Sequence, residues 1–342
     1  MKEVTPISLR KSEHLRINLE ENVQSGLTSG LEQYYFIHHA LPELDLADVN
    51  TEAKIFSKQL KAPILISSMT GGTLEASKIN RVLAAAAQET RIAMGVGSQR
   101  IVLEQPELAE TFNVRKLAPD ILLFANLGAI QLNYGYRIED CRRVVEMIEA
   151  DALILHFNAL QEAIQDGGDT KFSGLIKKVE AVCKALPVPV IAKEVGWGFS
   201  THDINLLVNA GVAAIDVAGA GGTSWSQVEM HRTENEERRQ LAAAFANWGI
   251  PTVEVIKNIL QESPGTMIIA SGGLRNGIDI AKSIALGASL GGMASPFLKA
   301  AAKSVEETVN LIKLLHEEIR ICMFATGSKT LFELRDGKIL KK

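Results

Sequence analysis

Several features that identify specialised classes of protein are scarce or absent in this sequence. Its three cysteines lie far apart and form no C-x-x-C pair, so neither a disulfide framework nor a zinc site is predicted. No apolar run approaches the roughly 18 residues of a membrane span, and residues 1–22 carry charges where a signal peptide has an apolar core. We therefore expect a soluble protein of the reducing cytoplasm.

The sequence also lacks a strong excess of charge of either sign. Its 36 Lys and Arg residues against 40 Asp and Glu residues leave a formal charge of −4, which predicts no broad basic surface for nucleic acid. Only 10 of the 342 residues are proline and 46% are hydrophobic, which is ordinary for a globular protein and excludes collagen and overall disorder. This length suits two domains or one α/β barrel.

Short apolar runs rich in Ile, Val and Leu alternate with longer amphipathic stretches beyond residue 62, which is typical of repeated βα units. We expect strands at residues 63–69, 92–97, 121–127, 152–158, 188–195, 213–218, 267–271 and 290–293. We expect helices at residues 74–90, 139–149, 174–186, 202–209 and 277–286. Nearly every strand is followed by small or polar residues, which favours an α/β fold of the (β/α)8 TIM barrel type over an open doubly wound sheet.

Two stretches do not fit the βα alternation. Residues 1–60 are polar, and we interpret them as an N-terminal extension that closes over the mouth of a barrel formed by residues 61–342. A long insertion, roughly residues 225–261, separates the sixth and seventh strands, and its charged centre is best interpreted as a solvated helix face. Residues 304–319 have helical periodicity and are expected to pack outside the barrel.

Glycine-rich segments end the last two predicted strands, at residues 271–277 and 291–296. Barrels often bind a phosphate in the loops after strands seven and eight, because small residues let it approach backbone N–H groups. Gly-Gly pairs also occur simply as tight βα turns, but two at consecutive strand ends favour a phosphate site.

A cation and neutral polar groups end other predicted strands. Lys193 closes an apolar strand and would project into the barrel mouth, unless a salt bridge with Glu194 or Asp216 satisfies it. Asn126 and Thr70 supply neutral hydrogen-bonding groups of the kind that hold a planar heterocycle. A phosphate site, a cation and these groups together suggest flavin mononucleotide, FMN.

A polar cluster interrupts the fourth predicted strand at residues 156–162. Its carboxylate, Glu162, lies beside histidine and amide side chains and would hold Mg²⁺, which takes few protein carboxylates and completes its shell with water and phosphate oxygens. Arg10, Lys11 and Arg100 form the basic group that converges on the same rim and would neutralise a diphosphate. Taken singly, each of these cations is explained as well by a surface charge.

With these motifs, the sequence resembles the type 2 isopentenyl-diphosphate isomerases, FMN-dependent (β/α)8 barrels, over nearly its whole length. The most specific matches are Arg-Lys-x-x-His at residues 10–14, Gly-Ser-Gln-Arg at 97–100 and Asn-Ala-Leu-Gln-Glu at 158–162. Further matching segments lie at residues 68–72, 126–129, 193–196, 220–225 and 271–275. One departure, Asp166-Gly167 where the family commonly has Pro-Glu, affects only the shape of a local loop.

The resemblance implies interconversion of isopentenyl and dimethylallyl diphosphate, for isoprenoid precursor biosynthesis, by proton addition and removal at reduced FMN. It implies Mg²⁺ on Glu162, NAD(P)H as the initial reductant and a homo-oligomer, a tetramer or octamer. The implied FMN residues are Ser68, Met69, Thr70, Ser98, Asn126, Lys193, Thr223, Gly273, Leu274, Arg275, Ala294 and Ser295. The implied substrate residues are Arg10, Lys11, Ser98, Gln99, Arg100, His156, Asn158 and Gln161.

The implied catalytic residues are Gln161, Lys193 and His156. A neutral amide is a weak acid or base, so we assign Gln161 to positioning first. Trp225 and Phe157 are candidates for shielding a cationic intermediate, although core packing is the better interpretation for Phe157.

Other functions on the same fold are less well supported. A 2-hydroxy-acid oxidase needs a histidine base and an arginine near the sixth strand end, and residues 218–223 contain neither. An IMP-dehydrogenase-like enzyme needs a nucleophilic cysteine on a mobile loop, whereas Cys141 and Cys183 fall in predicted helices and Cys322 lies near the C-terminus. A non-enzymatic flavin or phosphate sensor would have little need of the polar cluster at residues 156–162.

Overall fold

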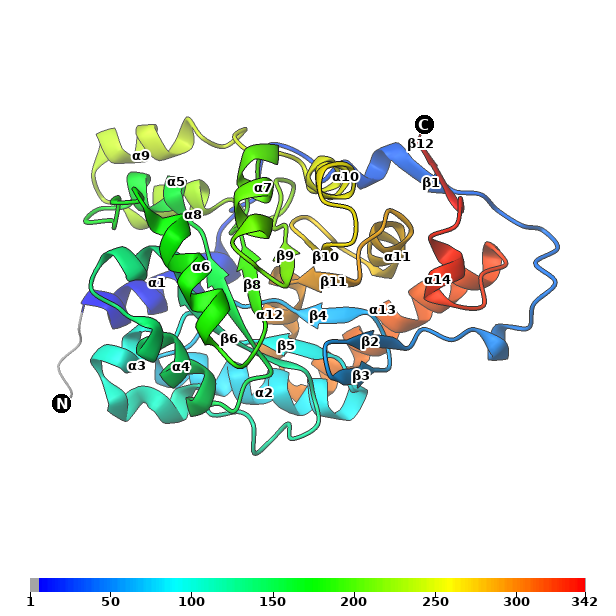
Figure 1. The fold of residues 1–342 in the computed structure, drawn as a ribbon, viewed down its shortest axis with the longest axis horizontal. Helices are drawn as coiled ribbons and strands as arrows, with labels where there is room; N and C mark the ends of the chain where they lie inside the picture. Colours follow the sequence, from blue (N-terminus) through cyan, green and yellow to red (C-terminus); the bar gives the residue numbers. More distant parts are fainter. Residues whose placement is uncertain (1–5, 342) are drawn as a thin grey trace.

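The structure of the protein is a computed structural model that describes residues 6–341. Within that range, eight parallel strands close into a barrel in the order β10-β11-β4-β5-β6-β7-β8-β9 (Figure 1). The strands are β4 (Ile64–Ile66), β5 (Ala93–Gly95), β6 (Leu123–Gly128), β7 (Ala152–His156), β8 (Val190–Lys193), β9 (Ala214–Asp216), β10 (Met267–Ser271) and β11 (Leu290–Met293). The predicted TIM barrel is confirmed, and the open-sheet alternative is wrong because β9 pairs with β10.

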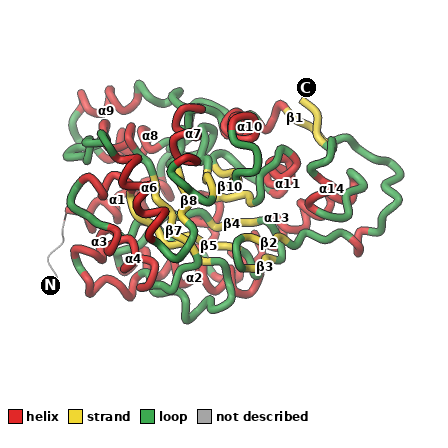
Figure 2. Tube along the Cα trace, in the orientation of Figure 1, coloured by secondary structure: helices red, strands yellow, loops and turns green. Residues whose placement is uncertain are grey.

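Helices surround the strands, as Figure 2 shows in red around the yellow barrel. The longer ones are α2 (Leu74–Thr90), α4 (Ile138–Met147), α6 (Leu175–Ala185), α7 (Thr201–Asn209), α10 (Thr252–Glu262), α11 (Gly277–Ala285) and α13 (Val305–Ala325). Shorter ones are α3 (Arg100–Glu104), α5 (Ala159–Ile164), α12 (Ser295–Ala301) and α14 (Leu331–Leu334). Short 3-10 segments lie at Leu31–Gln33, Leu46–Asp48, Pro106–Thr111 and Ala129–Asn133.

Local sequence explains where several of these helices begin. Thr73 caps α2 by accepting a hydrogen bond from the backbone N–H of Ala76, and Asn276 caps α11 in the same way. The apolar stripes of the helices then face strands that are buried on both sides, as parallel strands in a barrel are. The predicted exterior helix near the C-terminus is confirmed as α13, which packs against α2 and α11.

The predicted insertion between the sixth and seventh strands contains α8 (Trp225–Arg232), α9 (Glu236–Ala243) and α10. Because α10 packs on β10 and α7, it is the ordinary barrel helix of this unit, and only α8 and α9 are added. The charged run at residues 233–239 leads into α9 and forms its first turn, and it is largely exposed, as a solvated helix face should be.

Residues 6–60 reach both ends of the barrel. Helix α1 (Pro6–Glu20) contacts α8 and α12 at the mouth. The hairpin of β2 (Ala53–Ile55) and β3 (Lys58–Leu60) lies at the opposite end, where its apolar side chains pack on residues that fill the barrel floor. Between these parts, β1 (Tyr34–Phe36) pairs with β12 (Ile339–Lys341) near the C-terminus.

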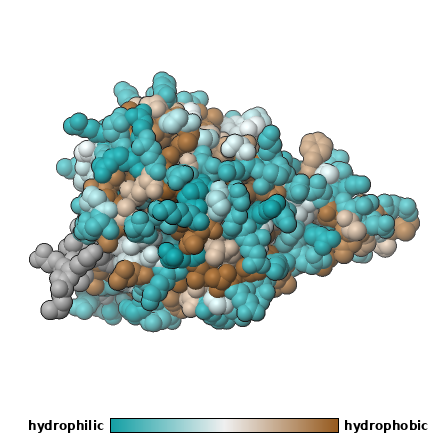
Figure 3. Space-filling view, turned by 90° about the horizontal axis from the view of Figure 1, so that it is seen from below, coloured by the Kyte–Doolittle hydropathy of each residue, from teal (hydrophilic) through white to brown (hydrophobic). Residues whose placement is uncertain are grey.

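The space-filling view shows a face that is mostly hydrophilic, with small scattered apolar areas, and that narrows away from the broad barrel body (Figure 3). In the described part of the chain, no helix combines the length and the apolar character needed to cross a membrane.

Candidate functional site

A cavity of about 650 Å³ opens at the carboxyl ends of the barrel strands. Parallel barrels place ligands at this end because the βα loops converge there. The cavity brings together almost every residue that the sequence predicted for the site. From the barrel loops it is lined by Ser68, Met69, Thr70, Ser98, Arg100, Asn126, His156, Asn158, Gln161, Glu162, Lys193, Thr223, Gly273, Leu274, Arg275, Ala294 and Ser295, and from α1 by Arg10 and Lys11.

One predicted substrate residue is wrong. The side chain of Gln99 is fully buried beside the cavity and does not line it. Its amide nitrogen donates to the carbonyl of Val144 at 2.9 Å, and its amide oxygen accepts the N–H of Asn126 at 2.9 Å. Gln99 therefore ties α4 to the end of β6, and it influences the site only through the placement of Asn126.

Unpaired hydroxyl groups mark the side of the cavity formed by β4. The Oγ atoms of Ser67 and Ser68 are buried and have no hydrogen-bond partner in the described protein. A Cβ added at Gly292 would lie 2.6 Å from Ser67 Oγ, so the glycine makes room for this hydroxyl against β11. Buried hydroxyls without partners are rare and indicate a polar ligand, which fits the edge of an isoalloxazine ring.

The glycine-rich loop after β10 packs against the loop after β9. Gly272 and Gly273 have φ angles of +97° and +80°, a region that side-chain-bearing residues rarely adopt. A Cβ on Gly273 would lie 2.6 Å from the backbone of Gly221. This compact turn, next to the start of α12, leaves backbone groups at the cavity wall, which suits a phosphate.

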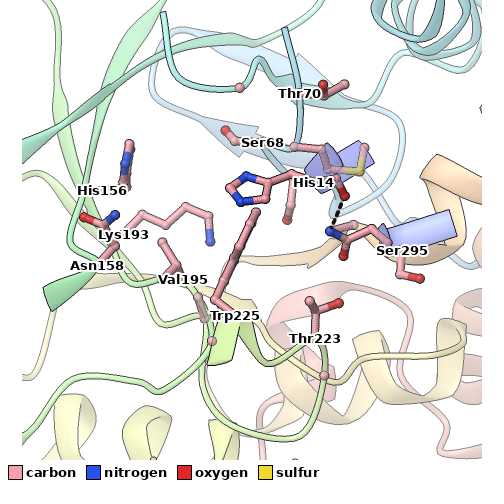
Figure 4. Close-up of a pocket in the computed structure, with 18 of the residues that line it drawn as sticks. His14, Ser68, Thr70, His156, Asn158, Lys193, Val195, Thr223, Trp225 and Ser295 are labelled. Atoms are coloured by element: carbon pink, nitrogen blue, oxygen red, sulfur yellow. Dashed lines mark hydrogen bonds between the residues drawn. The ribbon is translucent and has the colours of Figure 1, made fainter. Parts of the chain in front are cut away.

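Lys193 extends from β8 into the cavity (Figure 4). Its Nζ donates to the carbonyl of Glu194 at 2.9 Å and lies 3.6 Å from Asp216 Oδ2. Both sequence interpretations therefore hold, since the lysine lines the cavity and is also paired with Asp216. The carboxylate of Glu194 is instead held by the backbone N–H groups of residues 195–198. Burial raises the pKa of Glu194 to about 7, although those N–H groups act against the rise.

His156 stands beside Lys193 at the neighbouring strand end (Figure 4). Burial, together with the smaller effect of the charges of Lys193 and Lys11, lowers the pKa of His156 to about 4. The ring is therefore neutral near pH 7. Its Nδ1 lies 2.8 Å from Asn126 Oδ1, which only accepts, so Nδ1 carries the proton and Nε2 is left as an acceptor.

Gln161 belongs to a hydrogen-bonded group that sequence reasoning missed. Its Nε2 donates to Glu229 Oε1 at 3.2 Å, and the same oxygen lies 3.0 Å from His14 Nε2. Burial would raise the pKa of Glu229, but the hydrogen bond and charge of His14, together with Arg232, outweigh it and lower that pKa to about 2. His14 belongs to the Arg-Lys-x-x-His motif at residues 10–14, whereas no sequence motif marks Glu229.

The predicted metal ligand is held by three donors. Glu162 Oε1 accepts from Asn158 Nδ2 at 2.8 Å, while Oε2 accepts the backbone N–H of Asp169 at 2.7 Å and a hydrogen bond from Gln165. No group of three or more His, Cys, Asp or Glu side chains suited to a metal occurs among residues 6–341. One carboxylate fits Mg²⁺ only if substrate oxygens and water complete the shell, and the buried, unpaired Oδ1 of Asn158 adds a neutral oxygen.

Two of the predicted diphosphate cations are already engaged. Arg100 pairs with Asp169 at 2.7 Å and with Glu104 at 3.0 Å. Lys11 Nζ donates to the carbonyls of Gly71 and Ser98, each at 2.8 Å. Burial lowers the pKa of Lys11 to about 7, and neighbouring Arg10 adds to the effect.

The two aromatic candidates differ in position. Trp225 lines the cavity and meets the ring of His14 edge-on, with 5.0 Å between centroids. Phe157 packs edge-on against Phe199 at 5.8 Å and does not reach the cavity. Core packing is thus confirmed for Phe157.

Comparison with known proteins places this site in a family. Residues 145–341 match the family described as FMN-dependent dehydrogenase. An isopentenyl-diphosphate delta-isomerase of Nostoc sp. is 53% identical over 334 residues, which is 97% of this chain and 95% of the relative. The chain belongs to the isopentenyl-diphosphate delta-isomerase family, in its FMN-dependent type 2 branch. A second member of the family, from Rickettsia bellii, is 49% identical over 330 residues, 96% of each chain.

Solved structures extend the fold likeness beyond the family. A mandelate oxidase variant superposes with a TM-score of 0.65 at 20% identity, covering 99% of both chains. A flavocytochrome b2 variant gives a TM-score of 0.68 at 18% identity, covering 96% of this chain and 82% of the other. At such identities the likeness shows the shared barrel alone.

The alternative of an enzyme with a nucleophilic cysteine is not supported by the cavity. Cys141, Cys183 and Cys322 all lie outside it.

Proposed function

We propose that this chain interconverts isopentenyl diphosphate and dimethylallyl diphosphate, using reduced FMN. The observation that carries the proposal is one cavity with two unlike sides. The barrel loops supply unpaired hydroxyls, Lys193 and glycine turns that suit a flavin, while α1 supplies Arg10 and Lys11, which suit a diphosphate. The reacting hydrocarbon would lie between them.

The FMN site of this proposal is formed by the strand ends. The ring would lie against Ser68, Thr70 and Asn126, with Lys193 at its pyrimidine side, and the phosphate would bind at the turn around Gly273. When bound and reduced, FMN supplies a protonatable N5 and a negative charge near N1. Lys193 would stabilise that charge electrostatically without moving, because its strand already holds it in place.

The reaction moves a double bond without net electron transfer, so a proton is added at one carbon and another is removed two carbons away. We assign Gln161 to positioning: its Nε2 is held by Glu229, which fixes the direction of its amide oxygen. Neutral His156 would offer its Nε2 lone pair to the substrate side of the cavity. Trp225 would shield positive charge on the substrate with its ring.

The diphosphate would be bound by Arg10, Lys11 and Arg100 and by Mg²⁺ on Glu162. Binding energy from this remote group orients a small apolar chain that offers few contacts of its own. Arg100 would be shared between the diphosphate and Asp169. NAD(P)H as initial reductant, a tetramer or octamer and a cytoplasmic location belong to the same proposal and are inferred from the sequence resemblance.

The test is an anaerobic proton NMR assay with isopentenyl diphosphate, FMN, Mg²⁺ and a catalytic amount of NADPH, in which NADPH oxidation is followed in parallel. Dimethylallyl diphosphate formed in large excess over NADPH consumed is the expected result, because the reaction is redox-neutral. Absence of product from flavin-loaded, reduced protein would overturn the proposed activity. Omission of Mg²⁺ with added chelator tests the metal, and a loss of turnover is expected.

The role of Gln161 has its own test. Gln161→Asn shortens the side chain by one methylene group and moves its amide away from Glu229. We therefore expect kcat to fall at least about tenfold while FMN remains bound. Gln88→Asn, at a half-buried position on the outside of the barrel, is the matched control. Unchanged turnover in Gln161→Asn would remove this residue from the catalytic group.

A further inference from the structure

Two buried amide side chains at the wall of the cavity have an oxygen without a partner. Gln131 and Asn158 are 3% and 5% exposed, and both line the cavity. Neither Gln131 Oε1 nor Asn158 Oδ1 has a hydrogen-bond partner among the described residues. Asn158 lies on the same side of the cavity as His156 (Figure 4). A Cβ at Gly128 would lie 3.2 Å from His156 Nε2 and 3.5 Å from Gln131 Cγ, so Gln131 belongs to that side as well.

Carboxylate neighbours fix the orientation of both amides. Gln131 Nε2 donates to Asp169 Oδ2 at 3.2 Å, and Asn158 Nδ2 donates to Glu162 Oε1 at 2.8 Å. An ionised carboxylate only accepts hydrogen bonds, so each amide turns its nitrogen toward the carboxylate and keeps its oxygen free. The unpaired group of both residues is therefore an acceptor, and a buried acceptor without a donor calls for a ligand.

Free acceptors do not suit the substrate itself. The ionised oxygens of a diphosphate are acceptors too, and an isoprenoid chain carries no hydrogen-bond donor, so neither part of the substrate satisfies these amide oxygens. A hydrated cation supplies the missing donors. Mg²⁺ binds few protein carboxylates and keeps several of its water molecules, whose O–H groups then need acceptors.

Glu162 indicates where such a cation would bind. Its Oε2 already accepts two hydrogen bonds, from the backbone N–H of Asp169 and the amide of Gln165, whereas its Oε1 accepts only one, from Asn158. One lone pair of Oε1 is therefore free for a metal. Asp169 is bonded both to Glu162 and to Gln131. Gln131 thus lies one residue outside the direct ligand, which suits contact with a metal-bound water.

We propose that Gln131 Oε1 accepts a hydrogen bond from a water molecule of the Mg²⁺ on Glu162, and that this contact tightens binding of the metal together with the diphosphate. The inference rests on the proposed function, which places Mg²⁺ on Glu162. Groups that hold the ligands of a metal in this way typically contribute about ten- to a hundredfold to its affinity. The competing explanation is structural: Gln131 shares Asp169 with Arg100 and would act only by keeping that arginine in place.

The experiment measures binding of two probes, Mn²⁺ in place of Mg²⁺ and inorganic pyrophosphate, to the FMN-loaded protein. At saturating pyrophosphate, EPR titration of Gln131→Met is expected to give a Mn²⁺ dissociation constant about tenfold or more above the wild-type value. With chelator and no metal, calorimetry is expected to show pyrophosphate bound at least as tightly as by the wild type, because the amide oxygen then only places an acceptor beside an anion. Gln88→Met, which removes a similar hydrogen bond to Asp120 outside the barrel, is the matched control and leaves both values unchanged.

An unchanged Mn²⁺ dissociation constant in Gln131→Met would overturn the proposal. So would an equal loss of pyrophosphate affinity with and without metal, because a role that acts only through Arg100 needs no cation. A rise in the FMN dissociation constant as large as that for Mn²⁺ would contradict it as well, since the free oxygen would then face a donor of the flavin.

A second variant restores the acceptor. Gln131→Glu keeps an oxygen at the same reach, so it is expected to bind Mn²⁺ at least as tightly as the wild type and metal-free pyrophosphate more weakly. Weaker Mn²⁺ binding in this variant would refute the contact. Should neither variant fold, EPR of Mn²⁺ on the wild-type holoenzyme with pyrophosphate in ¹⁷O-enriched water decides: broadening by at least one bound water is expected, and its absence excludes the contact.

Failure of the proposed function is distinguishable from failure of this inference. If the metal site itself is wrong, the wild type binds no Mn²⁺ with pyrophosphate, or Glu162→Gln leaves that binding unchanged. When Glu162→Gln abolishes Mn²⁺ binding and the Gln131 variants bind it as the wild type does, the metal site stands and the role of Gln131 alone is rejected.

Discussion

At the scale of single residues, the site is a set of charges held in a cavity that excludes much of the surrounding water. Lys11 illustrates the consequence: it lies among backbone carbonyls and beside the ring of Phe112, and burial lowers its pKa to about 7. In the free enzyme its charge is present below that pH and is lost as the pH rises through it. The electrostatic attraction for a diphosphate is therefore titratable near neutrality.

We expect kcat/KM for the diphosphate substrate to fall as the pH rises above about 7, because this parameter reports the free enzyme. The kcat profile should lack that step, since the bound diphosphate anion restores the proton on Lys11. Lys11→Arg should flatten kcat/KM through pH 9, because arginine stays charged. Lys257→Arg, on the exposed face of α10, is the control. A decline that persists unchanged in Lys11→Arg would assign the titration to another group.

At the scale of elements, the cations of α1 depend on how that helix docks. Ile17 is fully buried and packs with Val23 and Val228 in a small apolar cluster, against which Trp225 also rests. This cluster is separate from the two that fill the barrel. Loss of its packing should therefore loosen α1 and α8 without unfolding the strands.

Ile17→Ala removes methyl groups from a site with no exposure, at a cost of about 2–5 kcal/mol for a core position. We expect KM for the diphosphate to rise about tenfold or more, with a smaller change in FMN affinity, because the flavin residues lie on the barrel. Leu9→Ala, on the same helix but 53% exposed, should leave KM near the wild-type value. Equal losses of FMN and substrate affinity would mean that α1 supports the whole cavity.

At the scale of the whole molecule, the two ends of the barrel have separate tasks. The ligand cavity lies at the carboxyl ends of the strands, and the opposite end is closed by the β2–β3 hairpin. Ile55 and Leu60 of that hairpin are nearly fully buried and pack with Leu65 and Phe124 of the barrel floor. In barrels of this kind the floor supports stability and the loops at the mouth carry chemistry.

Ile55→Ala should lower the free energy of unfolding by about 2–5 kcal/mol, as for other buried methyl deletions, with kcat and KM unchanged. Urea denaturation of the FMN-loaded protein measures the first quantity and the NMR assay the second. Lys54→Ala, at the exposed position between two buried ones on β2, is the matched control. A change in KM comparable to that of Ile17→Ala would contradict the separation of the two ends.

The sequence by itself determined the barrel and most of its ligand cavity. Short, nearly uninterrupted apolar runs that alternate with amphipathic stretches favour strands buried on both faces, and polar residues at the carboxyl ends of barrel strands meet at one rim. Lys193 and His156 were therefore placed correctly by chain position alone. The sequence also determined the helix at residues 74–90, because the spacing of its apolar residues and its threonine N-cap are both local features.

Only the tertiary structure decided which side chain of a motif faces the ligand and which distant groups join it. Gln99 stands between two cavity residues but turns outward, because it satisfies backbone groups of α4 and β6. Glu229 joins Gln161 from a helix 68 positions away along the chain. The pairing of Asp216 with Lys193 depends on strand register. Such choices depend on which buried polar groups find partners, and those partners meet only once the chain has folded.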